Sequence, residues 1–170
     1  AGYTTACIGK WHLGFDWEAI RRPDAKPIGQ GNRKTWPAEA FDWSKRIPDG
    51  PLAHGFDYYF GDDVPNFPPY AWIENDSVLE PPSVAYKPDP TPTEGSPEGR
   101  PGPMVAGWKQ DAVMPALTEK VLAWLEQQQG SEQPFFLYWP WTSPHAAIVP
   151  TRDWQGRTAA GGFGDFVAQS

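Results

Sequence analysis

The chain has 170 residues, the size of one ordinary domain, and 14 Lys and Arg against 21 Asp and Glu give it a net charge of −7. An acidic chain offers no broad basic surface for a phosphate backbone, and no apolar run reaches the roughly 20 residues that cross a bilayer. We therefore expect neither nucleic acid nor a membrane as a partner. The single cysteine, Cys7, cannot form a disulfide within the chain.

Proline and glycine are both frequent, with 21 and 17 residues, and they predict long loops. Ten Trp, nine Phe and six Tyr argue against disorder, because they supply apolar area that an unfolded chain would leave in water. The sequence begins directly in strand-like residues without an initiator Met. We expect an internal piece of a longer protein.

The first half of the chain predicts short strands separated by loops. Residues 3–8 favour a buried strand closed by Gly9, whereas residues 15–52 show no helical or strand period and predict a long surface excursion. Residues 55–61 form an aromatic run between glycines that we expect to pack on the main body. Residues 69–76 predict a short strand that ends in an Asn-Asp turn.

The second half contains the clearest periodic element, after a Pro-rich loop or flap at residues 87–103. A helix is predicted from an N-cap at Asp111 to a stop at Gly130, with Pro115 in its first turn. Its apolar face comprises Val113, Leu117, Val121, Trp124 and Leu125. The apolar run 134–139 then predicts a strand buried on both faces. A helix that leads into such a strand indicates an α/β fold with a largely parallel sheet flanked by helices.

Three side chains suited to an anionic substrate follow the predicted strands. Lys10 and His12 come after the first strand, and if that strand stays extended they project to the same side while Trp11 points away. His145 follows the strand at 134–139. In parallel sheets such strand ends meet at one edge, where a Lys compensates negative charge and imidazoles transfer protons near neutral pH. Taken alone, each of these residues could equally be a solvated or structural group.

The motifs in order resemble those of the sulfatase family, the formylglycine-dependent arylsulfatases and carbohydrate sulfatases. They are Gly2-Tyr3-Thr4-Thr5, Gly9-Lys10-Trp11-His12-Leu13-Gly14, Gly55-Phe56-Asp57-Tyr58-Tyr59-Phe60-Gly61, Pro69-Tyr70, Ile73-Glu74-Asn75-Asp76, Pro134-Phe135-Phe136-Leu137-Tyr138, Thr142-Ser143-Pro144-His145 and Gly164-Asp165-Phe166-Val167. The resemblance covers nearly the whole chain. It implies an alkaline-phosphatase-like α/β fold in which residues 1–170 are part of one catalytic domain, with its N-terminal and C-terminal parts missing.

The resemblance also implies a mechanism and a set of residue roles. Lys10 matches the lysine that contacts sulfate, and His12 matches the histidine that hydrogen-bonds the formylglycine diol and assists sulfate release. His145 matches the histidine that faces the sulfate and the leaving oxygen, where it can supply a proton. Both Lys10 and His145 are thus expected to bind substrate as well as to act in catalysis.

The chain also departs from the family pattern. No Cys/Ser-x-Pro-x-Arg motif occurs, so Cys7 is not the nucleophile, and we expect it to pack as a buried strand residue. The calcium ligands implied by the family would also lie outside this chain. Asp62 and Asp63 follow the aromatic run rather than the family's first strand, and we place no metal ligand in the chain.

The leading hypothesis is therefore hydrolysis of aryl or carbohydrate sulfates, with calcium and formylglycine supplied from outside this segment, which is inactive alone. A related phosphoester or phosphonate hydrolase and a Trp-rich carbohydrate-binding segment remain alternatives. For the latter, Trp17, Trp36, Trp43 and Trp72 lie in loops where a substrate rim would form. The family resemblance implies an exported, periplasmic or extracellular, or a lysosomal location.

Overall fold

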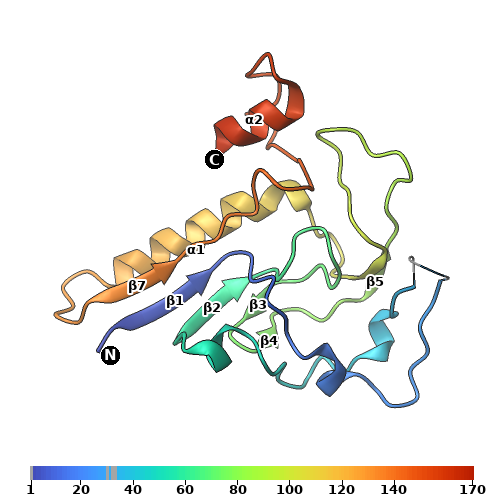
Figure 1. The fold of residues 1–170 in the computed structure, drawn as a ribbon, viewed down its shortest axis with the longest axis horizontal. Helices are drawn as coiled ribbons and strands as arrows, with labels where there is room; N and C mark the ends of the chain where they lie inside the picture. The colour runs from blue at the N-terminus through green and yellow to red at the C-terminus, as the bar shows by residue number, and fades with distance from the viewer. Residues whose placement is uncertain (1, 30, 32–33) are drawn as a thin grey trace.

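A computed structural model describes residues 2–29, 31 and 34–170 of the chain. Its centre is a mixed sheet with the strand order β4-β3-β2-β1-β7 (Figure 1). The strands are β1 (Thr4–Ile8), β2 (Tyr58–Gly61), β3 (Ile73–Glu74), β4 (Ser77–Val78) and β7 (Phe135–Tyr138). The central strands β2, β1 and β7 are parallel, and the short strands β3 and β4 add an antiparallel edge. The expected α/β class is confirmed.

The middle of the sheet is β1, which lies between two parallel neighbours. Its residue Ala6 pairs with Tyr58 of β2 on one side and with Leu137 of β7 on the other. The prediction of a strand closed by Gly9 is confirmed. The aromatic run at 55–61 is more than a packed loop, because its second half is the central strand β2.

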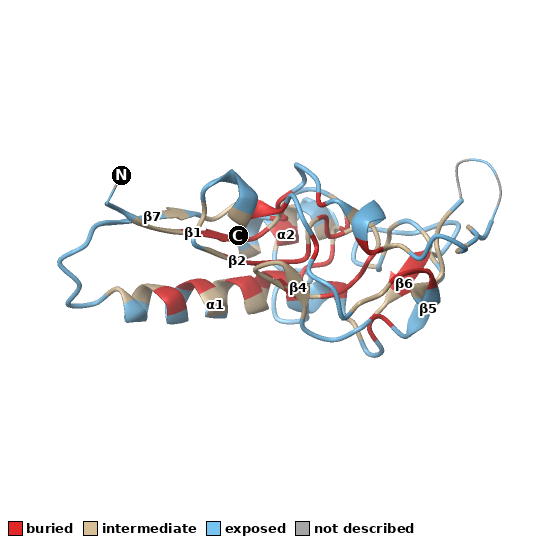
Figure 2. Ribbon diagram, turned by 90° about the horizontal axis from the view of Figure 1, so that it is seen from below, coloured by how far each residue is buried: buried red, intermediate tan, exposed pale blue. Residues whose placement is uncertain are grey.

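One face of the sheet is covered by the helix α1 (Val113–Gln127), whose buried side faces the strands (Figure 2). The residues packed together there are Ala6, Ile8, Phe60, Val113, Leu117, Val121 and Trp124. The predicted apolar face is confirmed, with Leu125 partly buried. The predicted cap is wrong: Asp111 lies in a 3-10 turn, Gln110–Ala112, and Ala112 occupies the N-cap position without a side-chain hydrogen bond. The extra turn separates Asp111 from the first α-helical residue.

The strand β7 is present as predicted, but it is not buried on both faces. Phe135 is 45% exposed, Phe136 52% and Tyr138 43%. Within the described residues β7 pairs with β1 alone and forms the edge of the sheet. The ring of Phe56 stacks on Phe136 and Tyr138 at centroid distances of 6.2 and 6.3 Å and covers them only in part.

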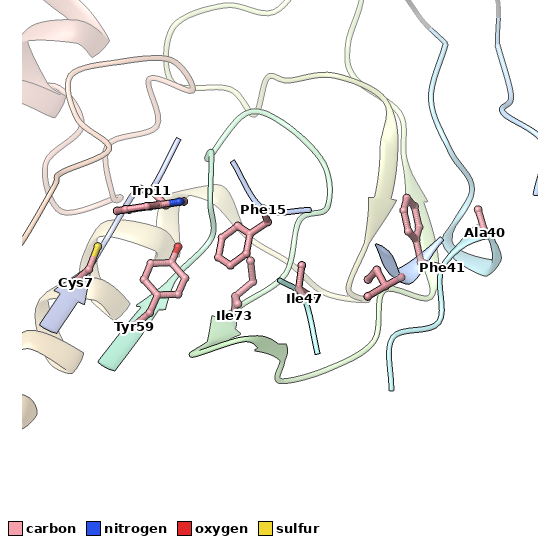
Figure 3. Close-up of a cluster of buried hydrophobic side chains, with 9 residues drawn as sticks. Cys7, Trp11, Phe15, Ala40, Phe41, Ile47, Tyr59 and Ile73 are labelled. Atoms are coloured by element: carbon pink, nitrogen blue, oxygen red, sulfur yellow. The ribbon is translucent and has the colours of Figure 1, made fainter. Parts of the chain in front are cut away.

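The other face of the sheet is covered by the excursion at residues 15–52 and the residues that follow it. In agreement with the prediction, its described residues form loops, with the short 3-10 helices Trp17–Ile20 and Ala38–Ala40, the start of a third, Pro51–His54, and two isolated β-bridges, Arg21 with Phe41 and Ile28 with Thr35. Aromatic and aliphatic side chains hold it on the strands, as Figure 3 shows. The buried members of this cluster are Cys7, Trp11, Phe15, Ile20, Ala40, Phe41, Ile47, Tyr59 and Ile73.

The Pro-rich loop at 87–103 connects the two strands of a small hairpin beside the sheet. The hairpin pairs β5 (Val84–Tyr86) with β6 (Gly102–Met104) in antiparallel fashion. The loop then reaches the C-terminal part of the chain, where Gly95 N–H donates to Ile148 O at 2.9 Å. Phe163 N–H, in the helix α2 (Gly161–Gln169), donates to Glu94 Oε2 at 3.0 Å.

Among the residues that the structure describes, no helix combines the length and the apolar character that a bilayer crossing requires.

Candidate functional site

The carboxyl ends of β1, β2 and β7 lie at one edge of the sheet (Figure 1). Lys10 follows β1, and its N–H donates to Pro140 O, just beyond β7, at 3.0 Å. Gly9 makes this approach possible, because a Cβ at that position would lie 2.2 Å from Pro140 O and its φ is +139°. Lys10 therefore lies at the end of the sheet where the three parallel strands finish.

The segment from Gly9 to His12 does not continue the strand. β1 ends at Ile8, and His12 adopts a left-handed backbone with a φ of 55°. The condition for Lys10 and His12 to project to the same side, an extended continuation of the strand, is therefore not met. The three side chains still differ in exposure: Trp11 is buried in the aromatic cluster, Lys10 is half-buried and His12 is exposed.

The turn after β2 follows the same edge with one extra residue. Gly9 N–H donates to Phe60 O at 2.9 Å, whereas Trp11 N–H donates to Asp63 O at 3.0 Å. The two-residue step from Gly9 to Trp11 thus matches the three-residue step from Phe60 to Asp63. An extra residue on one segment is the mark of a β-bulge, which redirects side chains at a strand end. Asp63 is also left-handed, with a φ of 57°. Backbone conformations of this kind concentrate at functional sites.

Asp63 holds the turn that carries Lys10 and His12. Its Oδ1 accepts a hydrogen bond from His12 N–H at 3.2 Å. Its own N–H donates to Tyr59 Oη at 3.2 Å, and Tyr59 Oη in turn donates to Gly9 O at 3.2 Å. Burial raises the pKa of Tyr59 far above its ordinary value, so the hydroxyl keeps its proton. These contacts fix both ends of the Gly9–His12 segment.

Asp63 was missed as a functional residue by the sequence reasoning, which weighed it only as a metal ligand. It lies 51 residues from His12 along the chain, and no local sequence pattern predicts the contact. Burial raises the pKa of its carboxyl, while the hydrogen bond from His12 N–H and the charges of His12 and Lys10 oppose that rise.

Asp62 is the most unusual ionisable group at this edge. Its side chain is 2% exposed, and neither carboxyl oxygen has a hydrogen-bond donor among the described residues. Burial raises the pKa of Asp62 to about 7; the nearby backbone N–H of Asp62 itself and the charge of Lys10 oppose the rise, and the neighbouring Asp63 adds to it. Asp62 thus places a second carboxyl within the electrostatic reach of Lys10.

His145 lies on the loop that follows β7. Its N–H donates to Thr142 O at 3.1 Å, and its ring is exposed. Nδ1 lies 2.7 Å from Ala146 O. A carbonyl oxygen only accepts hydrogen bonds, so this contact puts a proton on Nδ1 and leaves Nε2 free in the neutral ring.

The structure brings two of the three predicted site residues into one turn and places the third on the adjoining loop. Lys10 and His12 flank Trp11, and Lys10 is tied to Pro140, five residues before His145. Among the described residues, no hydrogen bond or ion pair joins His145 to Lys10 or His12. The approach of His145 to the other two remains a prediction.

The other residues of types that often act in catalysis, Cys7 and His54, make contacts typical of structural residues. Cys7 is fully buried, and burial raises the pKa of its thiol to about 12, in agreement with its expected role in the core. His54, at the end of the 3-10 helix Pro51–His54, has its Nε2 3.3 Å from Asp49 Oδ1 and its ring 5.6 Å from that of Trp11. In the part of the chain that the structure describes, no three His, Cys, Asp or Glu side chains gather in a way that could hold a metal ion.

Comparison with known proteins gives a consistent answer. A family model described as Sulfatase matches residues 1–164. The N-acetylgalactosamine-6-sulfatase of Mus musculus is 27% identical over 172 residues, which cover 99% of this chain and 25% of the relative. The N-acetylgalactosamine-6-O-sulfatase of Bacteroides thetaiotaomicron is 26% identical over 191 residues, covering 99% of this chain and 35% of the relative. The chain thus spans about a quarter to a third of the length of these curated relatives.

A solved structure also shares the fold. It comes from work on the metabolism of multiple glycosaminoglycans by Bacteroides thetaiotaomicron and superposes with a TM-score of 0.66 at 24% sequence identity. The match covers 99% of this chain and 37% of that chain. At this identity the likeness supports the fold of the described sheet and its surrounding segments.

Proposed function

This chain belongs to the sulfatase family, and we propose that it forms part of a catalytic domain that hydrolyses sulfate esters of carbohydrates. The observation that carries the proposal is the family match over residues 1–164, which includes the Gly9–His12 turn and the His145 loop. The relatives named N-acetylgalactosamine-6-sulfatases support a sulfated glycan as the substrate class.

In this proposal Lys10 binds the sulfate group. Its backbone is fixed by the hydrogen bond to Pro140 O, and the half-buried residue lies where the parallel strands end. A fixed ammonium compensates the negative charge of the sulfate, and this effect is stronger away from bulk water. Asp62 and Asp63 lie within the electrostatic reach of Lys10, so two carboxyls and one ammonium share this end of the sheet.

The two histidines are proposed to handle protons at the sulfate ester. His145 has a free Nε2, and its protonated form can donate to the leaving oxygen as the ester bond breaks. His12 is exposed at the same edge and donates a hydrogen bond to an oxygen of the reacting group. Asp63 positions His12 through the backbone rather than through the ring.

The family implies a calcium ion and a formylglycine nucleophile, and the described residues fit neither. They contain no metal-ligating cluster, and the thiol of Cys7 is buried with a raised pKa. The roles proposed for Lys10, His12 and His145 therefore concern the binding of sulfate and the transfer of protons only. It follows that the isolated 170-residue chain should be inactive.

Turnover of paired chromogenic esters tests this proposal. We expect the protein, expressed as its gene encodes it, to hydrolyse an aryl sulfate much faster than the matching aryl phosphate, while the purified 170-residue chain hydrolyses neither. Preference for the phosphate would favour a phosphoester hydrolase. Glycan binding without any turnover would favour a carbohydrate-binding segment. Sulfate turnover by the 170-residue chain would contradict the proposal that this segment carries only part of the catalytic site.

A histidine pair provides the matched control. His145→Ala should lower aryl sulfate turnover by roughly 10²- to 10³-fold, as expected when a group that stabilises developing charge is removed. His54→Ala should lower turnover far less, because His54 pairs with Asp49 at the surface and meets the site turn only by packing of its ring on Trp11, at a centroid distance of 5.6 Å. Equal effects of the two substitutions would remove His145 from the proposed site.

We further propose export or lysosomal delivery of the protein, which rests on the family alone. Recovery of the protein from the cytosolic fraction of its source cells would contradict this location.

A further inference from the structure

A cation other than Lys10 lies close to His12, on a segment far away in the sequence. The ring of Phe67 lies 6.1 Å from that of His12, edge to face, with an interplanar angle of 79°. The guanidinium of Arg100 lies 3.8 Å from the centroid of the same Phe67 ring. Because both groups contact one ring, the guanidinium and the imidazole lie within about 10 Å of each other.

Arg100 is held in place through its backbone. Its N–H donates to Asn66 O at 3.0 Å, and Tyr70 Oη donates to its carbonyl oxygen at 2.7 Å. Tyr70 is buried, and burial raises the pKa of its hydroxyl, so it remains a donor. Gly99 permits this close approach, since a Cβ there would lie 2.2 Å from Tyr70 Oη. The Pro-rich loop is thus fixed to the loop after β2 at the position of Arg100.

The guanidinium itself remains available. Arg100 is exposed, and its side chain forms no ion pair with any carboxylate that the structure describes. A cation–π contact uses the charge of the guanidinium but none of its N–H donors. A preorganised guanidinium with free donors matches a carboxylate or a sulfate, which it can bind through two parallel hydrogen bonds.

Arg100 also lines an open hollow. It has a volume of about 370 Å³ and is lined by the two ends of the Pro-rich loop, including Lys87 and Arg100. Asp89 also lines it, but its Oδ1 accepts hydrogen bonds from Thr91 N–H at 2.8 Å and Thr91 Oγ1 at 3.2 Å. Two cations and one internally hydrogen-bonded carboxylate make this hollow locally positive on a chain with a net charge of −7.

We propose that Arg100, together with Lys87, forms a second anion-binding subsite that selects glycans carrying an acidic group besides the sulfate that is cleaved. The guanidinium lies at most about 10 Å from the His12 ring, a distance at which the acidic group can belong to the sugar next to the sulfated one. A carboxylate and a second sulfate share the chemistry that Arg100 recognises. This inference rests on the proposed sulfatase activity and adds a substrate class to it.

Kinetics with four substrates test the subsite in the protein as its gene encodes it. The substrates are an aryl sulfate and three sulfated disaccharides, whose second sugar is neutral, carries a carboxylate or carries another sulfate. Arg100→Ala should raise KM about tenfold for an acidic disaccharide and leave the aryl sulfate and the neutral disaccharide within twofold. The carboxylated and doubly sulfated substrates show which anion the subsite prefers. Arg100→Lys, which keeps the charge without the planar fork, should lie in between.

Arg152→Ala is the matched control, because Arg152 is an exposed arginine on another loop. It should change none of the four KM values. An equal loss on all four substrates in Arg100→Ala would mean that Arg100 acts through Phe67 on His12 and would overturn the subsite. No change on any substrate would overturn it as well. Unchanged melting temperatures confirm that each variant is folded.

Binding separates this inference from the proposed activity. If the wild-type protein hydrolyses none of the four substrates, the proposed function fails, and calorimetric binding of the acidic disaccharides then decides the subsite. Binding that weakens about tenfold in Arg100→Ala and not in Arg152→Ala would support it. Equal binding by both variants would reject it.

Discussion

The two faces of the sheet are buried by different means. On one face, α1 covers Ala6, Ile8 and Phe60 with a regular apolar stripe. On the other face, loops and short 3-10 helices cover Cys7 and Tyr59 with scattered aromatic side chains. The loop-covered face includes Trp11, between the two predicted site residues Lys10 and His12. Regular packing thus supports the sheet, and irregular packing shapes the site.

The largest effect on stability is expected on the helix-covered face. Leu117 is fully buried there, and Leu117→Ala should lower the free energy of unfolding by about 2–5 kcal/mol through lost burial and a new cavity. Urea unfolding measures the change. Leu122→Ala on the same helix is the control, because Leu122 is 55% exposed and should cost less than about 1 kcal/mol. Similar losses in both variants would show that α1 does not anchor the sheet.

The helix is also where the sequence predicts the structure best. Its apolar residues repeat with the helical period, and the stretch is long enough for the period to be clear. The exposure of β7 could not be predicted, because an apolar strand sequence does not say whether a neighbour covers it. β2 was missed for a related reason: the run Tyr58-Tyr59-Phe60 is apolar throughout and has no alternation that separates a strand from a packed loop.

The second prediction concerns the charge of Asp62 at the sheet edge. Its folded-state pKa of about 7 is raised above the ordinary value of 3.8, so the folded state binds the proton more tightly. Stability therefore falls as the pH rises from about 4 to 7, by at most about 4 kcal/mol. Asp62→Asn removes this penalty and should be more stable than the wild type at pH 8, but not at pH 4.

Chemical unfolding at both pH values checks this prediction. Asp24→Asn is the control, because Asp24 is exposed and should show no pH-dependent difference from the wild type. A loss of stability in Asp62→Asn at pH 8 would mean that Asp62 is a paired carboxylate rather than a buried carboxyl without a partner.

The third and smallest effect on stability is expected at Asp63, where the consequence for activity is larger. Asp63→Ala removes the acceptor of His12 N–H and should cost about 1 kcal/mol of stability. The turn that carries His12 would relax, and kcat should fall by at least about tenfold, because misplacement of a catalytic group is costly. Measurement of kcat, KM and melting temperature separates the two effects.

Asp63→Asn is the matched variant for this position. Asn keeps an oxygen acceptor and tolerates the left-handed backbone, so most of the activity should remain. If Asn impairs kcat as much as Ala, the charge of Asp63 rather than its hydrogen bond to His12 is what matters.

For the candidate site, as for the fold, the sequence predicts some features and not others. The proposal of Lys10, His12 and His145 as site residues comes from motif resemblance and from their places after strands. The contacts that hold the Gly9–His12 turn could not be predicted, because Asp63 and Tyr59 reach it across gaps of about 50 residues along the chain. The left-handed turn at His12 also escaped prediction, since a strand-like sequence precedes it.

The most direct test of a sulfate site at this sheet edge is the aryl sulfatase activity of Lys10→Ala beside Lys45→Ala, both in the protein as its gene encodes it. Lys10 is half-buried at the end of β1, whereas Lys45 is exposed on the excursion. We predict that Lys10→Ala lowers kcat/KM by roughly 10²- to 10³-fold and that Lys45→Ala leaves it unchanged. Wild-type activity in Lys10→Ala would contradict a sulfate site at this edge of the sheet.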